Sequence, residues 1–501
     1  RIVASGGPSA ERSTRRRALM LAAALVVVVV AAGEVGAGGT HPSAAGGAAG
    51  GSAPNIVVIE SDDQTVEAMR VMDNVNSLIG AHGVTFANSF VNYSLCCPSR
   101  ATFLTGQYEH NHKVASNQWP NGGFPRFEQL HAYNNLAVWL HKAGYYTALI
   151  GKYLNAYKDD PPVPPGWSEW HAAPEGYGVY GYVLNNNGTL VHYGTAPTDF
   201  KQDVLTGKAV NLIERRAPKP NPFFLWLTYT APHWSPPDPN PNPPSNCRHA
   251  AKPAPRDAHA FDDEPLPTPP NFNERRIADK PKAIRDQPLL SQGQIDDIRR
   301  GYRCELESLL SVDRGVRQVV DALEASGELD QTLIVYTSDN GYFHGEHRIP
   351  KDKQHVYEES IRVPLEMRGP GVPQGETVND LVINADLAPT VVDASGAVPE
   401  LTMDGTSLLP VAATPGVEKG RALLIEEPTF EAIRTAGFMY AEHDTGEREL
   451  YNLKTDPFEL TNRAGDPSYA SIEAGLATRL HDLETCEGAT CRALQSGPGS
   501  G

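Results

Sequence analysis

Two pairs of oxygen-bearing side chains follow apolar segments that lie far apart in the sequence. Asp62 and Asp63 come after "NIVVIE", and Asp339 and Asn340 come after "TLIVYTS". Either pair alone is also typical of a solvated turn, and Asp-Asn-Gly is a strong turn signal. Oxygen donors of this kind suit a hard divalent cation such as Ca²⁺ or Mg²⁺ better than Zn²⁺. Together, the two pairs predict a site for a divalent cation, with Ca²⁺ as the first candidate and Mg²⁺ as the alternative; the sequence does not fix the choice between them.

A lysine and a histidine follow two further apolar segments of the same kind. Lys152 comes shortly after "YTALI", and His233 comes shortly after "FFLWLTYT". In open α/β sheets, ligands bind outside the carboxyl ends of the strands. One rim of the sheet is therefore expected to carry carboxylates, an amide, a lysine and a histidine.

The stretch "SLCCPSRATFLTG" places two cysteines side by side, Cys96 and Cys97. A disulfide between sequence neighbours needs strained geometry, so this pair is not expected to be a structural bridge. Pro98 suits the first turn of a helix and Gly106 suits its end, which places Cys96 just before a helix N-terminus. That position favours negative charge, so an anionic substrate is expected there, with Arg100 one turn along the helix.

The elements that must position these side chains alternate along the chain between strands and helices. Helical patterns cover, for example, residues 134–144 and 305–327. Apolar segments rich in β-branched and aromatic residues predict buried strands over 55–60, 146–150, 223–230 and 332–338. This alternation predicts an α/β fold with a large, mostly parallel sheet flanked by helices.

The chain, at 501 residues, exceeds the size of a single ordinary core, which predicts one large domain and a smaller one. The strand and helix rhythm fades from about Thr402, where short antiparallel strands and then a helix are expected. The proline-rich segment 234–282 is expected to lie over the surface near the rim. The expected division is a signal peptide and linker over 1–52, the α/β domain over 53–401, an α+β subdomain over 402–495 and a disordered tail over 496–501.

The N-terminal segment has the pattern of an export signal. A basic cluster at Arg15–Arg17 precedes an apolar run over 18–32, and Ser13-Thr14-Arg15-Arg16 is compatible with a twin-arginine leader. A retained membrane anchor is the alternative, for which the run is short. We therefore expect a secreted or extracytoplasmic protein without stable membrane association.

An exported protein can form disulfide bridges, because they persist in oxidising compartments. Cys486 and Cys491 are close enough in sequence to close a small loop, and Cys247 and Cys304 are a candidate second pair, although sequence leaves the connectivity open. The formal net charge of -17 argues against a nucleic-acid partner. A protein with this net charge can still have a local basic pocket.

The segment "CCPSR" followed by "ATFLTG" resembles the signature of the type I sulfatases, which belong to the alkaline phosphatase superfamily. "GQYEHNH" and "GKYLNAY" are especially similar to the N-acetylglucosamine-6-sulfatase branch, and "YEESIRVPL" and "ELYNLKTDPFELTN" are also sulfatase-like. The resemblance extends from about Asn55 to Pro467. It implies an alkaline phosphatase/sulfatase-like fold.

The resemblance also implies a chemistry for the cysteine pair. Cys96 would be oxidised to formylglycine by a formylglycine-generating enzyme and would join the metal ligands, while Cys97 would be a bystander. One hydroxyl of the aldehyde hydrate would attack sulfur, and deprotonation of the other would then expel sulfate. Arg100 would steady the sulfate oxygens together with the cation.

Three further residues match positions that have catalytic roles in sulfatases. Lys152 matches the lysine that holds the aldehyde hydrate. His233 and Lys353 match the candidate proton donors to the leaving alcohol, which needs a proton to depart. Many sulfatases have a histidine two residues after the first lysine, where this chain has Leu154. Asn155 is a poor base, so the base for sulfate expulsion stays open.

The sequence therefore predicts an exported, metal-dependent sulfatase that acts on a sulfated sugar or an aryl sulfate. One alternative is a phosphate or phosphonate monoester hydrolase of the same superfamily, and another is a non-catalytic sulfate-binding relative. The remaining histidines near the motifs are expected to be structural or to line the pocket: His110, His112, His344 and His347.

Overall fold

The structure, a computed structural model, describes residues 53–158, 162–174, 176–236, 247, 249–418 and 420–496. The expected export signal and linker over 1–52 lie outside these residues, as does nearly all of the expected tail over 496–501. No helix within the described ranges is long and apolar enough to cross a membrane.

The four predicted strands form the middle of one sheet and are adjacent in the order β8-β1-β7-β3. They run in parallel, with Ile56 of β1 opposite Phe224 of β7 and Leu333 of β8. Their carboxyl ends therefore meet at one rim, as predicted. Their bounds are β1 Asn55–Asp62, β3 Tyr146–Gly151, β7 Phe223–Pro232 and β8 Thr332–Ser338.

The described residues build a sheet of ten strands in the order β10-β2-β9-β8-β1-β7-β3-β4-β5-β6. β9 runs antiparallel to both of its neighbours, and β5 and β6 add an antiparallel edge, so the sheet is mixed around a parallel centre. The remaining bounds are β2 Val84–Phe90, β4 Glu169–Ala172, β5 Val183–Asn186, β6 Thr189–His192, β9 Leu365–Arg368 and β10 Glu376–Ile383.

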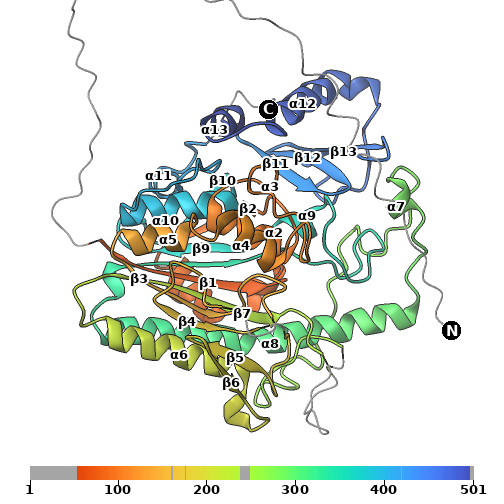
Figure 1. The fold of residues 1–501 in the computed structure, drawn as a ribbon. Helices are drawn as coiled ribbons and strands as arrows, with labels where there is room; N and C mark the ends of the chain where they lie inside the picture. Colours follow the sequence, from red (N-terminus) through yellow and green to blue (C-terminus); the bar gives the residue numbers. More distant parts are fainter. Residues whose placement is uncertain are drawn as a thin grey trace, which may run out of the picture. The chain divides into compact units, whose positions relative to one another are not determined.

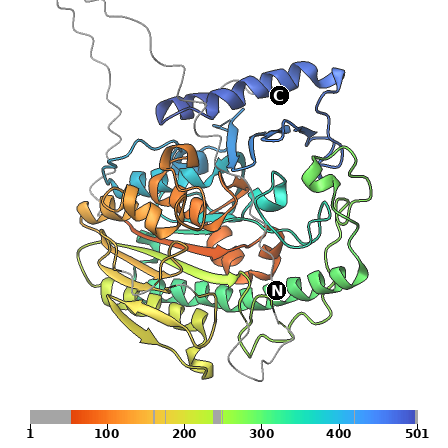
Figure 2. The same ribbon diagram turned by 45° about the vertical axis from the view of Figure 1, so that its right-hand side comes forward.

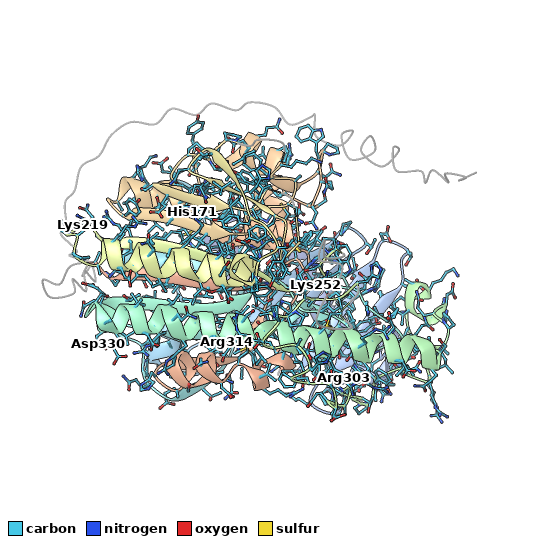
Figure 3. The ribbon with its side chains drawn as sticks, turned by 90° about the horizontal axis from the view of Figure 1, so that it is seen from below. His171, Lys219, Lys252, Arg303, Arg314 and Asp330 are labelled. Carbon is cyan, nitrogen blue, oxygen red and sulfur yellow. A yellow bond between two sulfur atoms is a disulfide. The ribbon has the colours of Figure 1, made fainter. Side chains whose placement is uncertain are left out.

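Helices cover both faces of this sheet, as Figure 1 shows. Because side chains alternate along a strand, Ile56 and Val58 of β1 join one apolar core, while Val57 and Ile59 join the core on the opposite face. The first face is covered by α2 Cys96–Thr105, α4 Gly123–His131, α5 Leu136–Lys142 and α10 Leu387–Ser395. The opposite face is covered by α6 Lys201–Arg216 and α8 Gln292–Ala325, which lie side by side in Figure 3.

Two helices begin earlier than the sequence pattern predicts. α8 begins at Gln292, because Ser291 and Gln294 form a capping box ahead of a polar, mostly exposed segment over 292–300. α2 begins at Cys96, so Pro98 lies inside the first turn, where its missing N–H costs little. α2 ends at Gly106, whose φ of 68° is readily adopted by glycine.

A smaller antiparallel sheet of four strands follows, as predicted for the C-terminal part of the chain. The helices α12 and α13 pack on this sheet (Figure 2). Its elements are β11 Ala422–Glu427, β12 Phe430–Thr435, β13 Phe438–His443, β14 Arg448–Asn452, α12 Ala470–Leu483 and α13 Ala489–Gln495. Shorter helices are α1 Asp73–Val75, α3 Glu109–His112, α7 Lys282–Arg285, α9 Glu358–Ile361 and α11 Leu408–Ala413.

Both candidate disulfides are present and the adjacent cysteines are not bridged. Cys247 is joined to Cys304, and Cys486 is joined to Cys491. Cys96 and Cys97 are both free and buried. The cysteine pair at the start of α2 is thus separate from the disulfide framework, as expected.

Candidate active site

The rim at the carboxyl ends of the four central strands brings the predicted side chains together. Asp62 ends β1, and Asp339 follows β8 directly. Lys152 follows β3 at Gly151, where φ is 119° and an added Cβ would lie only 1.8 Å from Thr228 O. A glycine is therefore needed at that position to bring Lys152 close to the neighbouring strand.

The thiol of Cys96 lies at the centre of this rim. Its Sγ is 3.4 Å from Asp62 Oδ1 and 2.9 Å from Lys353 Nζ. Burial, together with the nearby charge of Asp62, raises the pKa of Cys96 to about 12. As a plain thiol, this residue is held in the neutral form and is a weak nucleophile at neutral pH.

Each lysine contacts one carboxylate of the acidic pair. Lys152 Nζ is 2.6 Å from Asp62 Oδ2, and Lys353 Nζ donates to Asp63 Oδ1. Burial is the largest single influence and would raise the pKa of both carboxyl groups, but the paired lysine and His233 together outweigh it and hold these pKa values below the usual range. Both acids are thus kept ionised at neutral pH, as metal ligands must be.

Arg100 is fully buried beneath the rim. Its Nε donates to Asp339 Oδ2 at 2.9 Å, and another guanidinium nitrogen donates to Lys152 O at 3.1 Å. The third nitrogen, Nη2, forms an ion pair with Glu60 Oε1 at 3.5 Å and has no hydrogen-bond partner among the described residues. Arg100 is thus held between the acidic groups of Glu60 and Asp339.

Glu60 is a site residue that the sequence analysis missed. It lies within β1, accepts from Trp226 Nε1 at 2.7 Å and is 4% exposed. Burial raises its pKa to about 7, although Arg100 opposes that rise. The sequence feature that could have identified Glu60 is a single acid inside an apolar segment, because a charged side chain is rarely buried without a partner.

His233 lies at the same rim and faces solvent more than the lysines do. Its Nε2 is 3.7 Å from Asp63 Oδ2, and its Nδ1 is 2.7 Å from Trp234 O. That carbonyl accepts from Nδ1–H, which leaves Nε2 directed at the site. The ring stacks on Tyr177 at 4.1 Å, a contact that the sequence did not reveal.

Two of the predicted metal ligands, Asp62 and Asp63, lie in one cluster with Cys96, and Asp339 and Asn340 contact Asp63. Asp62, Asp63, Cys96 and His233 each place a possible ligand atom within 4.8 Å of the others. Asn340 Nδ2 donates to Asp63 Oδ1 at 2.6 Å, and Asp339 Oδ1 accepts from the Asp63 amide at 3.2 Å. Several buried carboxylate oxygens are thus held close together, which fits a hard divalent cation.

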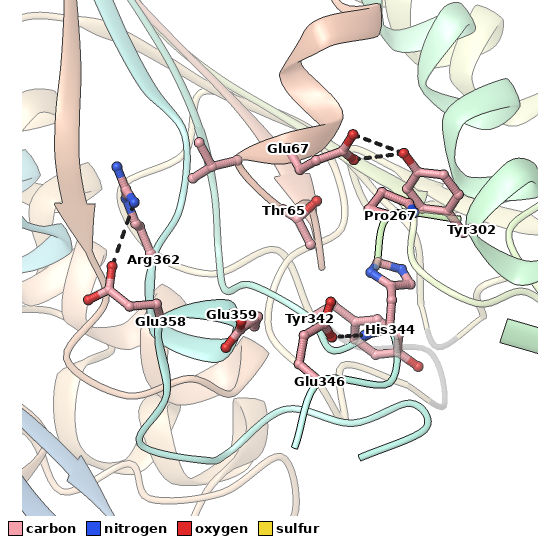
Figure 4. A pocket seen from close by; sticks show the side chains of 11 residues that line it. Thr65, Glu67, Pro267, Tyr302, Tyr342, His344, Glu346, Glu358, Glu359 and Arg362 are labelled. Carbon is pink, nitrogen blue, oxygen red and sulfur yellow. Dashed lines mark hydrogen bonds and ion pairs between the residues drawn. The ribbon is translucent and has the colours of Figure 1, made fainter. Parts of the chain in front are cut away.

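Other residues named from the sequence lie away from this centre. Leu154 is buried in the apolar core. His110 contacts Glu426, His112 contacts Thr102, and His347 contacts Glu274, so each is satisfied within the fold. His344 contacts Glu305 and lines a separate cavity of about 170 Å³, together with Glu67, Glu346 and Glu359 (Figure 4).

The C-terminal sheet also reaches the site through Glu427 at the end of β11. Glu427 Oε1 accepts from both the amide and the hydroxyl of Ser94, at 2.9 and 2.8 Å. Its Oε2 accepts from Gln354 Nε2 at 3.0 Å. The side chain of Glu427 thus contacts both the segment before Cys96 and the segment after Lys353. The local sequence around Glu427 does not predict this role.

Comparison with known families agrees with this geometry. Residues 54–397 match the sulfatase family profile, and residues 345–486 match the profile of the N-sulphoglucosamine sulphohydrolase C-terminal region. The chain therefore belongs to the sulfatase family, a family of sulfuric ester hydrolases.

The chain is similar in sequence to individual members of that family. It is 32% identical over 494 residues to the N-acetylglucosamine-6-sulfatase of Homo sapiens, covering 87% of this chain and 86% of that protein. It is 35% identical over 364 residues to the extracellular sulfatase Sulf-1 homolog of Caenorhabditis elegans, covering 72% of this chain. The chain spans about half of that second relative, 49% of its length.

A solved structure shows the same fold. The structure of BT4656 in complex with its substrate, D-glucosamine-2-N,6-O-disulfate, aligns with a TM-score of 0.72 and 26% identity. The alignment covers 89% of this chain and all of the other, 100%. The predicted alkaline phosphatase/sulfatase-like architecture is confirmed.

Proposed function

We propose that this protein hydrolyses sulfate esters at the rim centred on position 96, with formylglycine formed there from Cys96. The observation that carries the proposal is the convergence of Cys96, Lys353 and Asp62 within hydrogen-bonding distance at the N-terminus of α2. When formed, the aldehyde hydrate would supply the oxygen nucleophile that a buried, neutral thiol lacks.

A divalent cation, Ca²⁺ in preference to Mg²⁺, is the second part of the proposal. Asp62, Asp63, Asp339 and Asn340 would hold it, together with position 96. When bound, the cation would act as a Lewis acid toward the sulfate oxygens. Oxygen donors kept ionised by neighbouring lysines support this assignment.

The side chains around the centre would bind the sulfate group and the hydrate and would protonate the leaving group. Arg100 would steady a sulfate oxygen, and Lys152 would hold the hydrate in place. His233 Nε2 and Lys353 Nζ both face the centre, and either would deliver a proton to the oxygen of the leaving alcohol. This chain has Leu154 where many sulfatases have a histidine, so the base for sulfate expulsion is left unassigned.

A direct test is turnover of an aryl sulfate, an aryl phosphate and an aryl phosphonate by the same preparation. We expect the sulfate to be hydrolysed with the highest kcat/KM. Preference for the phosphate or phosphonate would favour the alternative hydrolase. An unmodified thiol at position 96, without turnover of any ester, would favour a non-catalytic sulfate-binding protein.

We also propose that the protein works outside the cytoplasm and is modified at Cys96 by a formylglycine-generating enzyme. Two disulfides among the described residues support export, since such bridges persist in oxidising compartments. Fractionation of the producing cells tests this directly. Recovery of the mature protein in the cytoplasm, with both bridges reduced, would contradict it.

A further inference from the structure

A second group of candidate metal ligands lies outside the rim and is formed by His347, Glu359 and Glu459. Each of these residues places one ligand atom within 4.8 Å of the others. Two ligands that lie about 2.0–2.4 Å from one ion are at most about 4.8 Å apart, so a single ion can reach all three. His347 and Glu459 are almost inaccessible, with exposed fractions of 0% and 1%.

Each carboxylate of this group has one oxygen without a partner. Glu359 Oε1 accepts from Asn271 Nδ2 at 2.8 Å, and Glu459 Oε2 accepts from the Glu358 amide at 3.1 Å. The other oxygens, Glu359 Oε2 and Glu459 Oε1, are buried without a hydrogen-bond partner in the described part of the chain. Two buried carboxylates side by side repel each other, so either protons or a cation must neutralise them.

The neighbours of His347 direct a lone pair of its ring into this group. His347 Nδ1 is 2.8 Å from Glu274 Oε2, and a carboxylate at that distance requires the proton to lie on Nδ1. Nε2 then carries the lone pair, which accepts from Asn271 Nδ2 at 3.2 Å. A carboxylate behind a histidine in this way orients the ring and raises its basicity as a metal ligand.

Asn271 provides an observation that is independent of the acids. This residue is 0% exposed, and its amide lies between Glu359 and His347, because Nδ2 contacts both. Its Oδ1 is buried and has no hydrogen-bond partner among the described residues. An ion beside the amide, or a water molecule bound to that ion, supplies the missing partner. Protons on the carboxylates alone would leave this oxygen unsatisfied.

Two other groups of candidate ligands in the described ranges are built around disulfide sulfurs. One contains Cys247 and Cys304, and the other contains Cys486 and Cys491. The thiolate is the form of cysteine that binds a metal, so bridged sulfurs are poor ligands. Apart from the rim, the group around His347 is therefore the strongest candidate in this part of the chain.

We propose that His347, Glu359 and Glu459 bind a divalent ion of the Zn²⁺ type, separate from the Ca²⁺ proposed for the rim. Three side chains that include an imidazole nitrogen suit the low coordination number of Zn²⁺, whereas Ca²⁺ takes about six to eight oxygens. The cavity in Figure 4 provides the access, because Glu346, Glu358 and Glu359 are among its lining residues. Carboxylates on that wall attract a cation.

The three ligands come from segments that are distant in sequence. His347 follows β8, Glu359 lies in α9, and Glu459 follows β14 of the C-terminal sheet. His347 and Glu459 have φ values of 49° and 55°, which are uncommon for residues with a side chain. One ion would thus fasten the segment after the C-terminal sheet to two segments that follow the large sheet, and would stabilise the folded chain.

The test is calorimetric titration of Zn²⁺ into protein that is first saturated with Ca²⁺, with bound zinc counted by elemental mass spectrometry. Wild type is expected to bind a single Zn²⁺, and its Tm is expected to rise with added Zn²⁺, because the ion binds the folded state. Glu459→Gln and His347→Gln should weaken zinc binding at least about a hundredfold. Glu274→Gln, which removes only the carboxylate that orients His347, should weaken it about tenfold.

Glu366→Gln is the matched control. Glu366 is also buried and its Oε2 also lacks a partner among described residues, but it lies in β9, outside this group of ligands. Its replacement should leave zinc affinity unchanged. Asp62→Asn should likewise retain the zinc, because Asp62 belongs to the rim.

Failure of Ca²⁺-loaded wild type to bind Zn²⁺ would refute the second site, whatever the variants do. The same conclusion follows if Glu459→Gln and Glu366→Gln lose zinc equally, or if Asp62→Asn loses it while Glu459→Gln retains it. Should Glu459→Gln and His347→Gln fail to fold, Glu274→Gln decides, and zinc affinity equal to that of wild type would then refute the site.

Discussion

Lys353 Nζ lies 2.9 Å from Cys96 Sγ and also contacts Asp63, so one ammonium group joins the proposed nucleophile to a proposed metal ligand. The two residues come from opposite halves of the chain, Cys96 from the start of α2 and Lys353 from the segment after β8. A proton on Lys353 is therefore close to any ester bond that is being broken at position 96.

If Lys353 or His233 protonates the leaving oxygen, its replacement should affect poor leaving groups most. Lys353→Ala and His233→Ala are expected to reduce turnover of alkyl or sugar sulfates about 10²–10⁴-fold, and that of nitrophenyl sulfates much less. Lys351→Ala is a suitable control, because Lys351 contacts Asp297 near the surface. Equal losses across leaving groups would assign both residues to sulfate binding.

The proposed metal site predicts that Asp62→Asn lowers both activity and bound divalent ion. Asp62 is fully buried and its charge is balanced by Lys152, so the amide removes a ligand with little change in volume. Elemental mass spectrometry of the purified variant measures the metal content, with the exposed Asp297→Asn as control. Full activity of wild type after chelation to a metal-free state would refute the site.

The central strands and the rim were predictable because strands buried on both faces are apolar almost throughout. "NIVVIE" and "TLIVYTS" are adjacent as β1 and β8, which brings Asp62 close to Asp339. Parallel pairing converts this linear pattern into a site, so the residues just after each strand could be named without a structure.

Other parts of the site depend on contacts that local sequence does not encode. Glu60 is recognisable only once Trp226 and Arg100 are seen to surround it. Tyr177 and Glu427 come from a loop and from the C-terminal sheet, and both reach the site through tertiary packing. The start of α8 was missed because residues 292–300 are mostly polar and exposed.

Glu427 is expected to position the two segments that carry Cys96 and Lys353. Glu427→Ala removes the acceptor for Ser94 and Gln354, which should lower kcat more than it raises KM. Glu427→Gln retains one acceptor oxygen and should recover part of the loss. The measurement is steady-state kinetics on an aryl sulfate; a change confined to thermal stability, with kcat intact, would reduce Glu427 to a packing role.

His110 predicts a pH-dependent contribution to stability. Burial opposes its protonation, but the hydrogen bond and charge of Glu426 prevail and raise the pKa of His110 to about 9, from the usual 6.5. Because the folded state binds the proton more tightly, this contribution is complete below pH 6.5 and is lost as pH rises through 9. It amounts to at most about 3 kcal/mol.

Urea unfolding at several pH values between 6 and 10 measures this contribution. His110→Gln should flatten the decline in the free energy of unfolding over that range, whereas His82→Gln, at an exposed position, should leave the wild-type slope unchanged. An identical slope in wild type and His110→Gln would show that the contact with Glu426 does not control stability at alkaline pH.

The two adjacent cysteines should behave differently when replaced by serine. Cys96→Ser supplies one hydroxyl where the aldehyde hydrate supplies two, so it should accept at most one sulfate per site and retain it as a serine sulfate. Cys97→Ser leaves the Cys-x-Pro-Ser-Arg frame intact and should keep substantial turnover. Normal multiple turnover by Cys96→Ser would contradict the proposed nucleophile.

The most direct measurement is the mass of the peptide that contains Cys96, taken from active wild-type protein. The account predicts an aldehyde, or its hydrate, at position 96 and an unmodified thiol at Cys97. Active protein with an unmodified thiol at position 96, or with the aldehyde at position 97 instead, would contradict it.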